Sequence, residues 1–282
     1  MKKISLIALF AALVAVNINA TDLFVGSHAV TWDTPLNLEA AKFADAKAGD
    51  KIVVTYTDAA HGIEFKIPEV WDHMAGSREA AWINGAAAYE QFITEKALEQ
   101  LKANGLQIVG ENFTCTKVEL LDGRVLKEGV TVWAGFFWAD DWSTLELYKE
   151  GYNTVDFSKA TALRIYSEAG RSDFTINIKE SWDEGSGQIA DQAAMTAGDG
   201  YMELALTDDL RTRLANAGHW MIQFNKDAGN PFNVTDIVLV MKDTADGIAN
   251  TAAQTKTVKM IENGQIVIIN NGVRYNALGA QL

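Results

Sequence analysis

The sequence predicts an all-β protein made of two tandem antiparallel β-sandwiches, each with one short helix, followed by a small β-meander tail. Three observations predict it: many short runs of β-branched and aromatic residues bounded by Gly, Asp and Asn, an internal repeat, and helix signals that occur once per copy. A chain of 282 residues can hold one large domain or two of about 100 to 150 residues. The strand–helix alternation of an α/β fold is missing from the sequence.

Four blocks of the first half recur in the same order in the second half. YTDA at 56–59 returns as YSEA at 166–169, and IPEVWD at 67–72 returns as IKESWD at 178–183. Blocks at 93–105 and 113–118 match blocks at 206–218 and 232–237. Because the offset grows only in small steps, as loop insertions would cause, the sequence predicts two copies of one domain, over residues 21–124 and 127–242.

The expected strands are alternating or continuous apolar runs with high β-propensity. They cover residues 51–57, 63–67 and 115–121 in the first copy and 162–166, 174–178 and 201–206 in the second.

Each copy also carries one helix pattern. Thr94 is a good N-cap before Glu95, and that helix should close at Asn104-Gly105. Thr207 begins a similar segment that ends at Gly218. Each sandwich is therefore expected to hold a single short helix.

The N-terminal segment is typical of a secretory signal peptide. Lys2 and Lys3 precede an apolar run over residues 4–16, and Ala20 offers a small residue at the cleavage point. Residues 1–20 are therefore expected to be removed, and the mature protein to be secreted to the periplasm or the cell exterior.

The C-terminal segment predicts a linker and a β-meander. Residues 243–254 are small and polar, which suits a flexible linker. Asn263-Gly264 and Asn271-Gly272 are strong hairpin signals within the tail, residues 255–282. Three strands of this length are too few to hold a stable core alone.

Charge and cysteine content exclude several classes of function. The formal net charge is −13, or −15 without Lys2 and Lys3, and phosphate neutralisation needs clustered basic residues. Nucleic acid is therefore not an expected partner. The single cysteine, Cys115, allows neither an intramolecular disulfide nor a cysteine-rich zinc site.

The repeated Ile-x-Glu-x-Trp-Asp segment is the most informative local feature. In a strand, residues two apart share a face, so Glu and Trp should lie together, and an ionised Glu is costly in a dry core. An open indole flanked by carboxylates suits a sugar, whose C–H face stacks on the ring while its hydroxyls donate to the acids. The alternative is that both tryptophans anchor the cores. The candidate ligand-binding residues are Glu69, Trp71 and Asp72 in the first copy and Glu180, Trp182 and Asp183 in the second.

Two further tryptophans are second-choice platforms. Trp32 and Trp142 occupy comparable places near the start of each copy, six and seven residues after Gly26 and Gly135. Most of the eight tryptophans are expected to fill the cores, because Trp is on average well buried.

No cofactor is expected. Asp140 and Asp141 could contribute oxygens to a Ca²⁺ site, but adjacent loop acids are more often simply solvated. No catalytic group is assigned either. A glycoside hydrolase needs two carboxylates across one bond, whereas the repeat places Glu69 and Glu180 in separate copies.

The first copy resembles a known family on several motifs. They are KAGDKIVV at 47–54, YTD at 56–58, IT at 93–94, Leu98, Leu101, NGL at 104–106, Gly110, NFT at 112–114 and TKV at 116–118. The pattern resembles jelly-roll, carbohydrate-binding-module-like domains of secreted polysaccharide-utilisation proteins from Gram-negative gut-type bacteria. The second copy lacks the Gly-Asp-Lys and Asn-Gly-Leu stretches. The tail, with IENGQ at 261–265 and NGVRYNALG at 271–279, is similar to C-terminal segments of exported proteins in such bacteria, some of which serve sorting.

The sequence therefore predicts a non-catalytic polysaccharide-binding protein, because tandem copies raise avidity for a repeating polymer. Association with a glycoside hydrolase or with cell-surface proteins is what the resemblance implies. The alternatives are a structural or adhesive surface protein, which burial of all eight tryptophans would favour, and a glycoside hydrolase.

Overall fold

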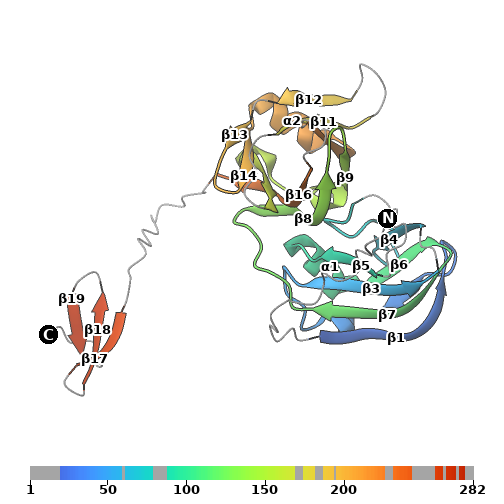
Figure 1. Ribbon diagram of the computed structural model, residues 1–282, viewed down its shortest axis with the longest axis horizontal. Coiled ribbons are helices and arrows are strands. Elements are labelled where there is room, and N and C mark those ends of the chain that lie inside the picture. Colours follow the sequence, from blue (N-terminus) through green and yellow to red (C-terminus); the bar gives the residue numbers. More distant parts are fainter. Residues whose placement is uncertain are drawn as a thin grey trace, which may run out of the picture. The chain divides into compact units, whose positions relative to one another are not determined.

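The computed structural model is an all-β structure of antiparallel sheets, as the sequence predicts (Figure 1). It describes residues 20–58, 61–78, 88–168, 174–181, 187–193, 195–225, 231–242, 258–262, 265–270 and 273–276. The signal-peptide prediction lies outside these residues except for Ala20, which begins the first strand. The predicted linker 243–254 and both Asn-Gly turns also lie outside them.

The N-terminal sandwich, residues 20–121, packs two antiparallel sheets face to face. One sheet has the order β1-β7-β3-β5 and the other β2-β6-β4. Its elements are β1 (Ala20–Val30), β2 (Leu36–Leu38), η1 (Ala40–Phe43), β3 (Lys51–Thr57), β4 (His61–Lys66), β5 (Ala88–Phe92), α1 (Glu95–Asn104), β6 (Leu106–Glu111) and β7 (Phe113–Leu121).

The C-terminal sandwich, residues 130–241, is also built from two antiparallel sheets. Their orders are β13-β14-β10-β16-β8 and β12-β11-β15-β9. Its elements are β8 (Val130–Ala139), β9 (Thr144–Tyr148), η2 (Lys149–Gly151), η3 (Phe157–Lys159), β10 (Ala160–Ser167), β11 (Thr175–Lys179), β12 (Gln188–Ala193), β13 (Thr196–Ala197), β14 (Tyr201–Ala205), α2 (Asp208–Asn216), β15 (His219–Asn225) and β16 (Phe232–Met241).

The two sandwiches share one strand order. In each, the first strand pairs with the last, the last with the third, and the third with the strand before the helix, giving β1-β7-β3-β5 and β8-β16-β10-β14. In the opposite sheets, β2-β6-β4 corresponds to β9-β15-β11. The loops between β1 and β2 and between β8 and β9 are therefore equivalent, as are the segments that follow β4 and β11.

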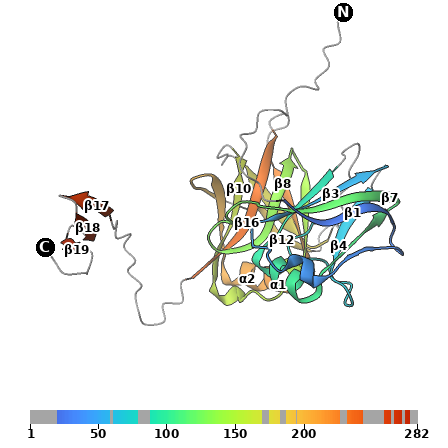
Figure 2. The ribbon, with the colours of Figure 1, turned by 90° about the horizontal axis from the view of Figure 1, so that it is seen from below.

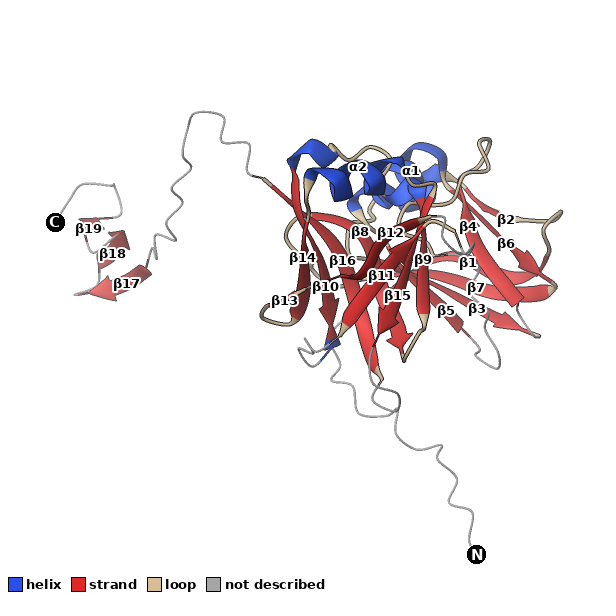
Figure 3. Cartoon of the chain, turned by 90° about the horizontal axis from the view of Figure 1, so that it is seen from above, coloured by secondary structure: helices blue, strands red, loops and turns tan. Residues whose placement is uncertain are grey.

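Each helix begins where the sequence predicts, at a threonine N-cap. The Thr94 hydroxyl accepts from Ala97 N at 3.2 Å, and the Thr207 hydroxyl accepts from Leu210 N at 3.2 Å. The first helix ends at Gly105, whose φ of 80° lies in the left-handed region and whose Cβ position is 2.2 Å from Leu38 O. Only glycine fits there. Figure 3 shows each helix at one end of the strands of its sandwich.

Each sandwich has its own buried core. Residues between Leu23 and Leu120 form the first, and Phe43, Phe65 and Leu101 are among its fully buried members. Residues between Val132 and Leu239 form the second, where Trp220 stacks on Tyr152 with ring centroids 4.0 Å apart. Cys115 is a free, buried thiol.

Arg124, in the segment between β7 and β8, links the two sandwiches. Its guanidinium lies 4.5 Å from the ring centroid of Phe92 in β5 and 5.4 Å from that of Phe136 in β8. Nη2 also donates to Thr235 O at 2.5 Å and pairs with Asp236 Oδ1 at 3.2 Å. One side chain thus contacts both sandwiches through aromatic and ionic groups. Figure 2 shows the two sandwiches from below.

The chain divides into two compact units, one ending at Lys242 and one starting at Asp243. The second contains an antiparallel three-stranded sheet, as expected for the tail, with β17 (Val258–Glu262), β18 (Gln265–Asn270) and β19 (Val273–Asn276) in that order. The limits 21–124 and 127–242 proposed for the repeats remain a prediction.

Candidate functional site

The structure describes six of the eight tryptophans, and they fall into two groups. Trp133 and Trp220 are buried in the C-terminal sandwich, as expected for core residues. Trp32, Trp71, Trp138 and Trp142 are exposed by 42%, 47%, 61% and 55%. The expectation that most tryptophans fill the cores is therefore wrong for the described ones. Trp82 and Trp182 lie outside the described residues.

Trp71 lies in a tight loop rather than in a strand. The strand β4 ends at Lys66, and the bridge between Lys66 and His73 closes the loop. Trp71 N donates to Ile67 O at 3.0 Å, and Ile67 N donates to Asp72 O at 2.8 Å. The strand alternation used to put Ile67, Glu69 and Trp71 on one face is therefore wrong: Ile67 is buried in the core while the acid and the indole are exposed.

The backbone of this loop is strained. Glu69 has a φ of 69° and Trp71 a φ of 60°, in the left-handed region that costs L-residues roughly 1–2 kcal/mol. Pro68 fixes its own φ just before Glu69 and helps the chain reverse. A bulky residue rarely adopts this conformation unless its surroundings impose it.

Trp142 shows the same combination of exposure and strain. It lies in the turn between β8 and β9 with a φ of 63°. Its N–H donates to Phe224 O at 2.8 Å, and its carbonyl accepts from Gln223 Nε2 at 3.4 Å. The Ser143 hydroxyl, bonded to Asp140 O at 2.7 Å, closes the turn beneath it. The main chain is held firmly while the ring stays in water.

Trp32 occupies the equivalent loop of the N-terminal sandwich, between β1 and β2. The Thr31 hydroxyl organises this turn by accepting from Asp33 N at 3.2 Å and Thr34 N at 3.0 Å. Trp32 and Trp142, which occupy comparable places in the sequence, thus also lie in equivalent loops of the two sandwiches.

The predicted residues do not form one site. Val30, at the end of β1, pairs with Phe113, whereas Lys66, at the end of β4, pairs with Gln107. The Trp32 and Trp71 loops therefore lie at opposite ends of the N-terminal sandwich. In the C-terminal sandwich, Trp142 and the end of β11 are likewise at opposite ends.

Only part of the second predicted set is described. Glu180 is exposed at a bend after β11, and its N–H donates to Gly187 O at 2.8 Å. Trp182 and Asp183 lie outside the described residues. The equivalence of the two acid–Trp segments therefore rests on the strands that precede them.

One or two acids lie within two residues of each exposed loop tryptophan in the sequence. Within the described ranges, no ion pair forms at Asp33, Glu69, Asp72, Asp140 or Asp141. Other acids of the sheets are paired, such as Glu90 with Lys51 at 2.8 Å and Glu203 with Arg164 at 2.6 Å. Apart from one Asp140 oxygen, which accepts from Asp141 N at 2.8 Å, these carboxylates can accept hydrogen bonds from a ligand.

Sequence reasoning did not select Trp138 as a ligand residue. It lies on β8 opposite Asn233 of β16, whose side-chain amide donates to Glu168 at 2.8 Å. The neighbouring Phe137 packs towards the core. Strand alternation from Phe137 could have indicated that the next ring faces outward.

Asp140 and Asp141 do not assemble a metal site with other residues. The Asp140 carboxylate accepts from Asp141 N at 2.8 Å. No cluster of three or more His, Cys, Asp or Glu suited to a metal is found in the part of the chain that the structure describes.

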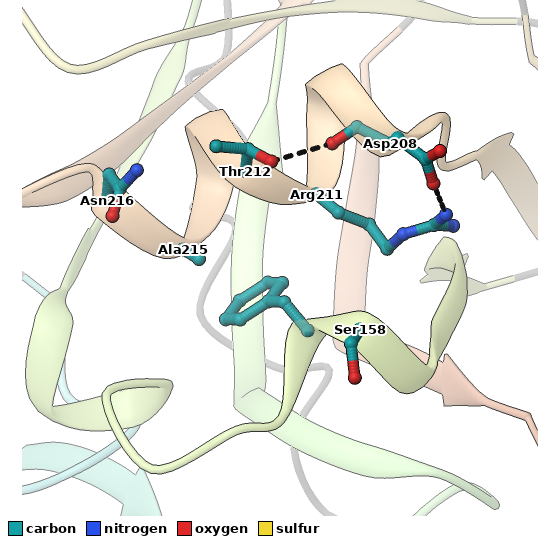
Figure 4. A pocket seen from close by; sticks show the side chains of 7 residues that line it. Ser158, Asp208, Arg211, Thr212, Ala215 and Asn216 are labelled. Atoms are coloured by element: carbon teal, nitrogen blue, oxygen red, sulfur yellow. Dashed lines mark hydrogen bonds and ion pairs between the residues drawn. The ribbon is translucent and has the colours of Figure 1, made fainter.

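None of the exposed tryptophans lines the hollow beside α2. About 440 Å³ in volume, it lies between α2 and η3 and is lined by Phe157, Ser158, Asp208, Arg211, Thr212, Ala215 and Asn216 (Figure 4). Arg211, its only cation, already donates to Ala160 O at 3.2 Å, to Leu206 O at 2.7 Å and to the Asp208 carboxylate. With that guanidinium occupied, the hollow offers little to a ligand.

Among the described residues, no helix is long and apolar enough to cross a membrane.

No family model and no curated protein matches the chain. The solved structures that show a weak likeness include the following two. One is SGBP-B of the Bacteroides ovatus mixed-linkage glucan utilization locus in complex with a mixed-linkage heptasaccharide, with 20% identity over 36% of this chain and 28% of that chain, and a TM-score of 0.32. The other, from Parabacteroides distasonis and named as secreted, has 9% identity over 80% of this chain and 84% of that chain, and a TM-score of 0.22. This chain thus spans less than a third of the first protein, and both scores are too low to support an argument about ligand.

Proposed function

We propose that this protein is exported and binds a polysaccharide without catalysing its cleavage, using the exposed rings of Trp71, Trp142 and Trp32. Glu69 and Asp72 would accept hydrogen bonds from the sugar beside Trp71. Glu180, Trp182 and Asp183 would serve the segment after β11 in the same way.

One observation carries the proposal: Trp71 and Trp142 combine exposed indoles with a φ near 60°. Left-handed backbone destabilises the fold, and an apolar ring left in water gives up about 1.5–3 kcal/mol of burial. Neither feature serves stability, so a binding role explains why both are present.

A flat ring exposed beside free carboxylates fits a sugar well. The pyranose C–H face stacks on the indole, and the sugar hydroxyls donate to carboxylate oxygens that are not paired with a cation. Several modest sites along one chain suit a repeating polymer, because each further contact is intramolecular once the first is made.

The burial of all eight tryptophans, which would have favoured a purely structural or adhesive protein, does not occur, since four of the six described rings are exposed. Association with a glycoside hydrolase or with cell-surface proteins, which the family resemblance implies, is compatible with this proposal.

Affinity electrophoresis in gels containing soluble glycans tests the proposal. We expect at least one glycan to retard the full chain, and Trp71→Ala with Trp142→Ala to weaken retardation by about tenfold or more. Trp→Tyr at both positions should retain most binding, because a flat ring remains, whereas Trp→Leu should not. Retardation that is unchanged in the Ala double variant would reject these residues, and no retardation by any glycan would reject the function.

A further inference from the structure

The charge around the exposed tryptophans bears on which glycans the proposed sites accept. Every described tryptophan in a loop has an acid next to it or within two residues: Asp33 for Trp32, Glu69 and Asp72 for Trp71, and Asp140 and Asp141 for Trp142.

These loops contain no basic residue to offset the acids. Residues 31–35, 67–72 and 139–143 read TWDTP, IPEVWD and ADDWS. The basic side chains on either side of the Trp71 loop are already engaged, because Lys66 pairs with Glu64 at 2.9 Å and His73 Nε2 lies 3.1 Å from the same carboxylate. A ligand resting on Trp71 therefore meets negative charge.

We infer that these sites select uncharged polysaccharides and reject chains that carry carboxylates or sulfates. The inference rests on the proposed glycan-binding function and names its substrate class. A neutral sugar offers hydroxyl donors, which carboxylate acceptors need. A uronate offers a second acceptor of the same charge, so the hydrogen bond is lost and repulsion replaces it.

The size of the discrimination follows from Coulomb's law. Two unit charges about 4 Å apart in water repel by about 1 kcal/mol, which is roughly fivefold in affinity, and salt reduces this at exposed sites. With one or two acids at a loop, we expect a carboxylated chain to bind about 5- to 25-fold more weakly than its neutral counterpart at low salt. The difference should shrink to about twofold at about 0.5 M salt.

Matched pairs of polysaccharides provide the test. The full chain is run in gels containing a β-glucan, a galactan or a mannan, each beside the same polymer oxidised to the carboxylate at C6, at low and at high salt. Two variants are compared with the wild type: Glu69→Gln with Asp72→Asn, and Asp140→Asn with Asp141→Asn. Glu99→Gln with Asp209→Asn is the matched control, because it removes the same charge from exposed positions on the two helices.

The inference predicts that a neutral polymer retards the protein and that its oxidised partner retards it weakly or not at all. In the loop variants, the affinity for the oxidised polymer should rise by at least threefold, and in the control variant it should not change. Equal or stronger binding of the oxidised polymer at low salt would overturn the inference and leave the glycan-binding function standing. Failure of every polymer to retard the protein would reject the function itself, and the inference with it.

Discussion

At the scale of single residues, the conformation of Trp71 and Trp142 separates them from the core tryptophans. Trp220 is fully buried, stacks on Tyr152 and donates from Nε1 to Leu214 O at 3.0 Å. That residue serves stability directly. The two loop tryptophans instead sit in backbone that disfavours a side chain.

Trp142→Gly and Trp142→Ala isolate this backbone strain. Glycine tolerates a φ of 63° without a steric penalty. We therefore expect the free energy of unfolding of the Gly variant to be about 1 kcal/mol higher than that of the Ala variant. At an ordinary loop position the order would be reversed, because glycine has a more flexible unfolded state. Urea denaturation measures the difference. An Ala variant more stable than the Gly variant would show that the position is not strained.

Glu64 carries a charge-dependent part of the stability. Burial alone would raise the pKa of its carboxyl, but hydrogen bonds and charge from His73 and Lys66 outweigh burial and lower that pKa. A lowered pKa in the folded state means that the stabilisation is present above the ordinary pKa of glutamate and is lost as the pH falls through the folded value.

Glu64→Gln should therefore reduce the free energy of unfolding by about 3 kcal/mol at pH 7. The substitution removes the carboxylate that pairs with Lys66, whose ammonium group stays largely buried. The gap to the wild type should narrow as the pH is lowered below about 4. Glu90→Gln, at an exposed pair, is the control and should cost under about 1 kcal/mol. A gap that does not change with pH would contradict this role.

At the scale of elements, the sequence indicated both helices and six of the sixteen described strands of the two sandwiches, because their signals are local. The threonine caps mark the start of both helices, and the run at residues 51–57 is the strand β3. The sequence did not indicate the loop of Trp71, because residues 67–71 can be placed on alternating faces as if the strand continued. Only the chain reversal to His73 ends the strand at Lys66.

The two N-caps should differ in their contribution to stability. Thr94 is buried beneath Gly76, whose Cβ position would lie 2.6 Å from Thr94 Cγ2, whereas Thr207 is exposed. Thr94→Ala loses a cap and buried packing, so we expect a cost of about 2 kcal/mol, against about 1 kcal/mol for Thr207→Ala. Thermal unfolding with fitted enthalpies gives both values. Equal costs would mean that the packing around Thr94 contributes nothing beyond the cap.

At the scale of the whole molecule, Arg124 is the residue that most clearly joins the two sandwiches. Its partner Asp236 is 1% exposed, and burial raises the pKa of that carboxyl despite the opposing charge of Arg124. A raised pKa in the folded state favours folding at low pH and costs stability as the pH rises through it.

Arg124→Ala should destabilise the protein by about 2–4 kcal/mol at pH 7, because it leaves a buried carboxylate without its cation. The loss should be smaller at about pH 5, where Asp236 takes up a proton more readily, and Asp236→Asn should restore part of it. Arg213→Ala, which breaks an exposed helix pair with Asp209, serves as the control. A pH-independent loss, or no recovery in the double variant, would contradict the coupling.

The sequence could predict the all-β class, the helices and the tail, but not how the candidate residues assemble. Whether Trp32 and Trp71 share a site depends on strand register and direction, which place their loops at opposite ends of the sandwich. Exposure depends on which neighbours fold over a ring, so Trp133 and Trp138 on the same strand have opposite environments. The meeting of two loops depends on the whole strand order, whereas the opposite faces of Trp133 and Trp138 follow from local alternation once β8 is recognised as a strand.

Hydroxyl-radical footprinting of the full chain, with each tryptophan followed by mass spectrometry, tests the central claim most directly. Without glycan, Trp71 and Trp142 should be oxidised readily and Trp220 hardly at all. With a saturating neutral polysaccharide that retards the protein in gels, oxidation of Trp71 and Trp142 should fall severalfold while Trp220 stays unchanged. Undiminished oxidation of both loop rings in the bound state would contradict the assignment of these indoles as the binding surface.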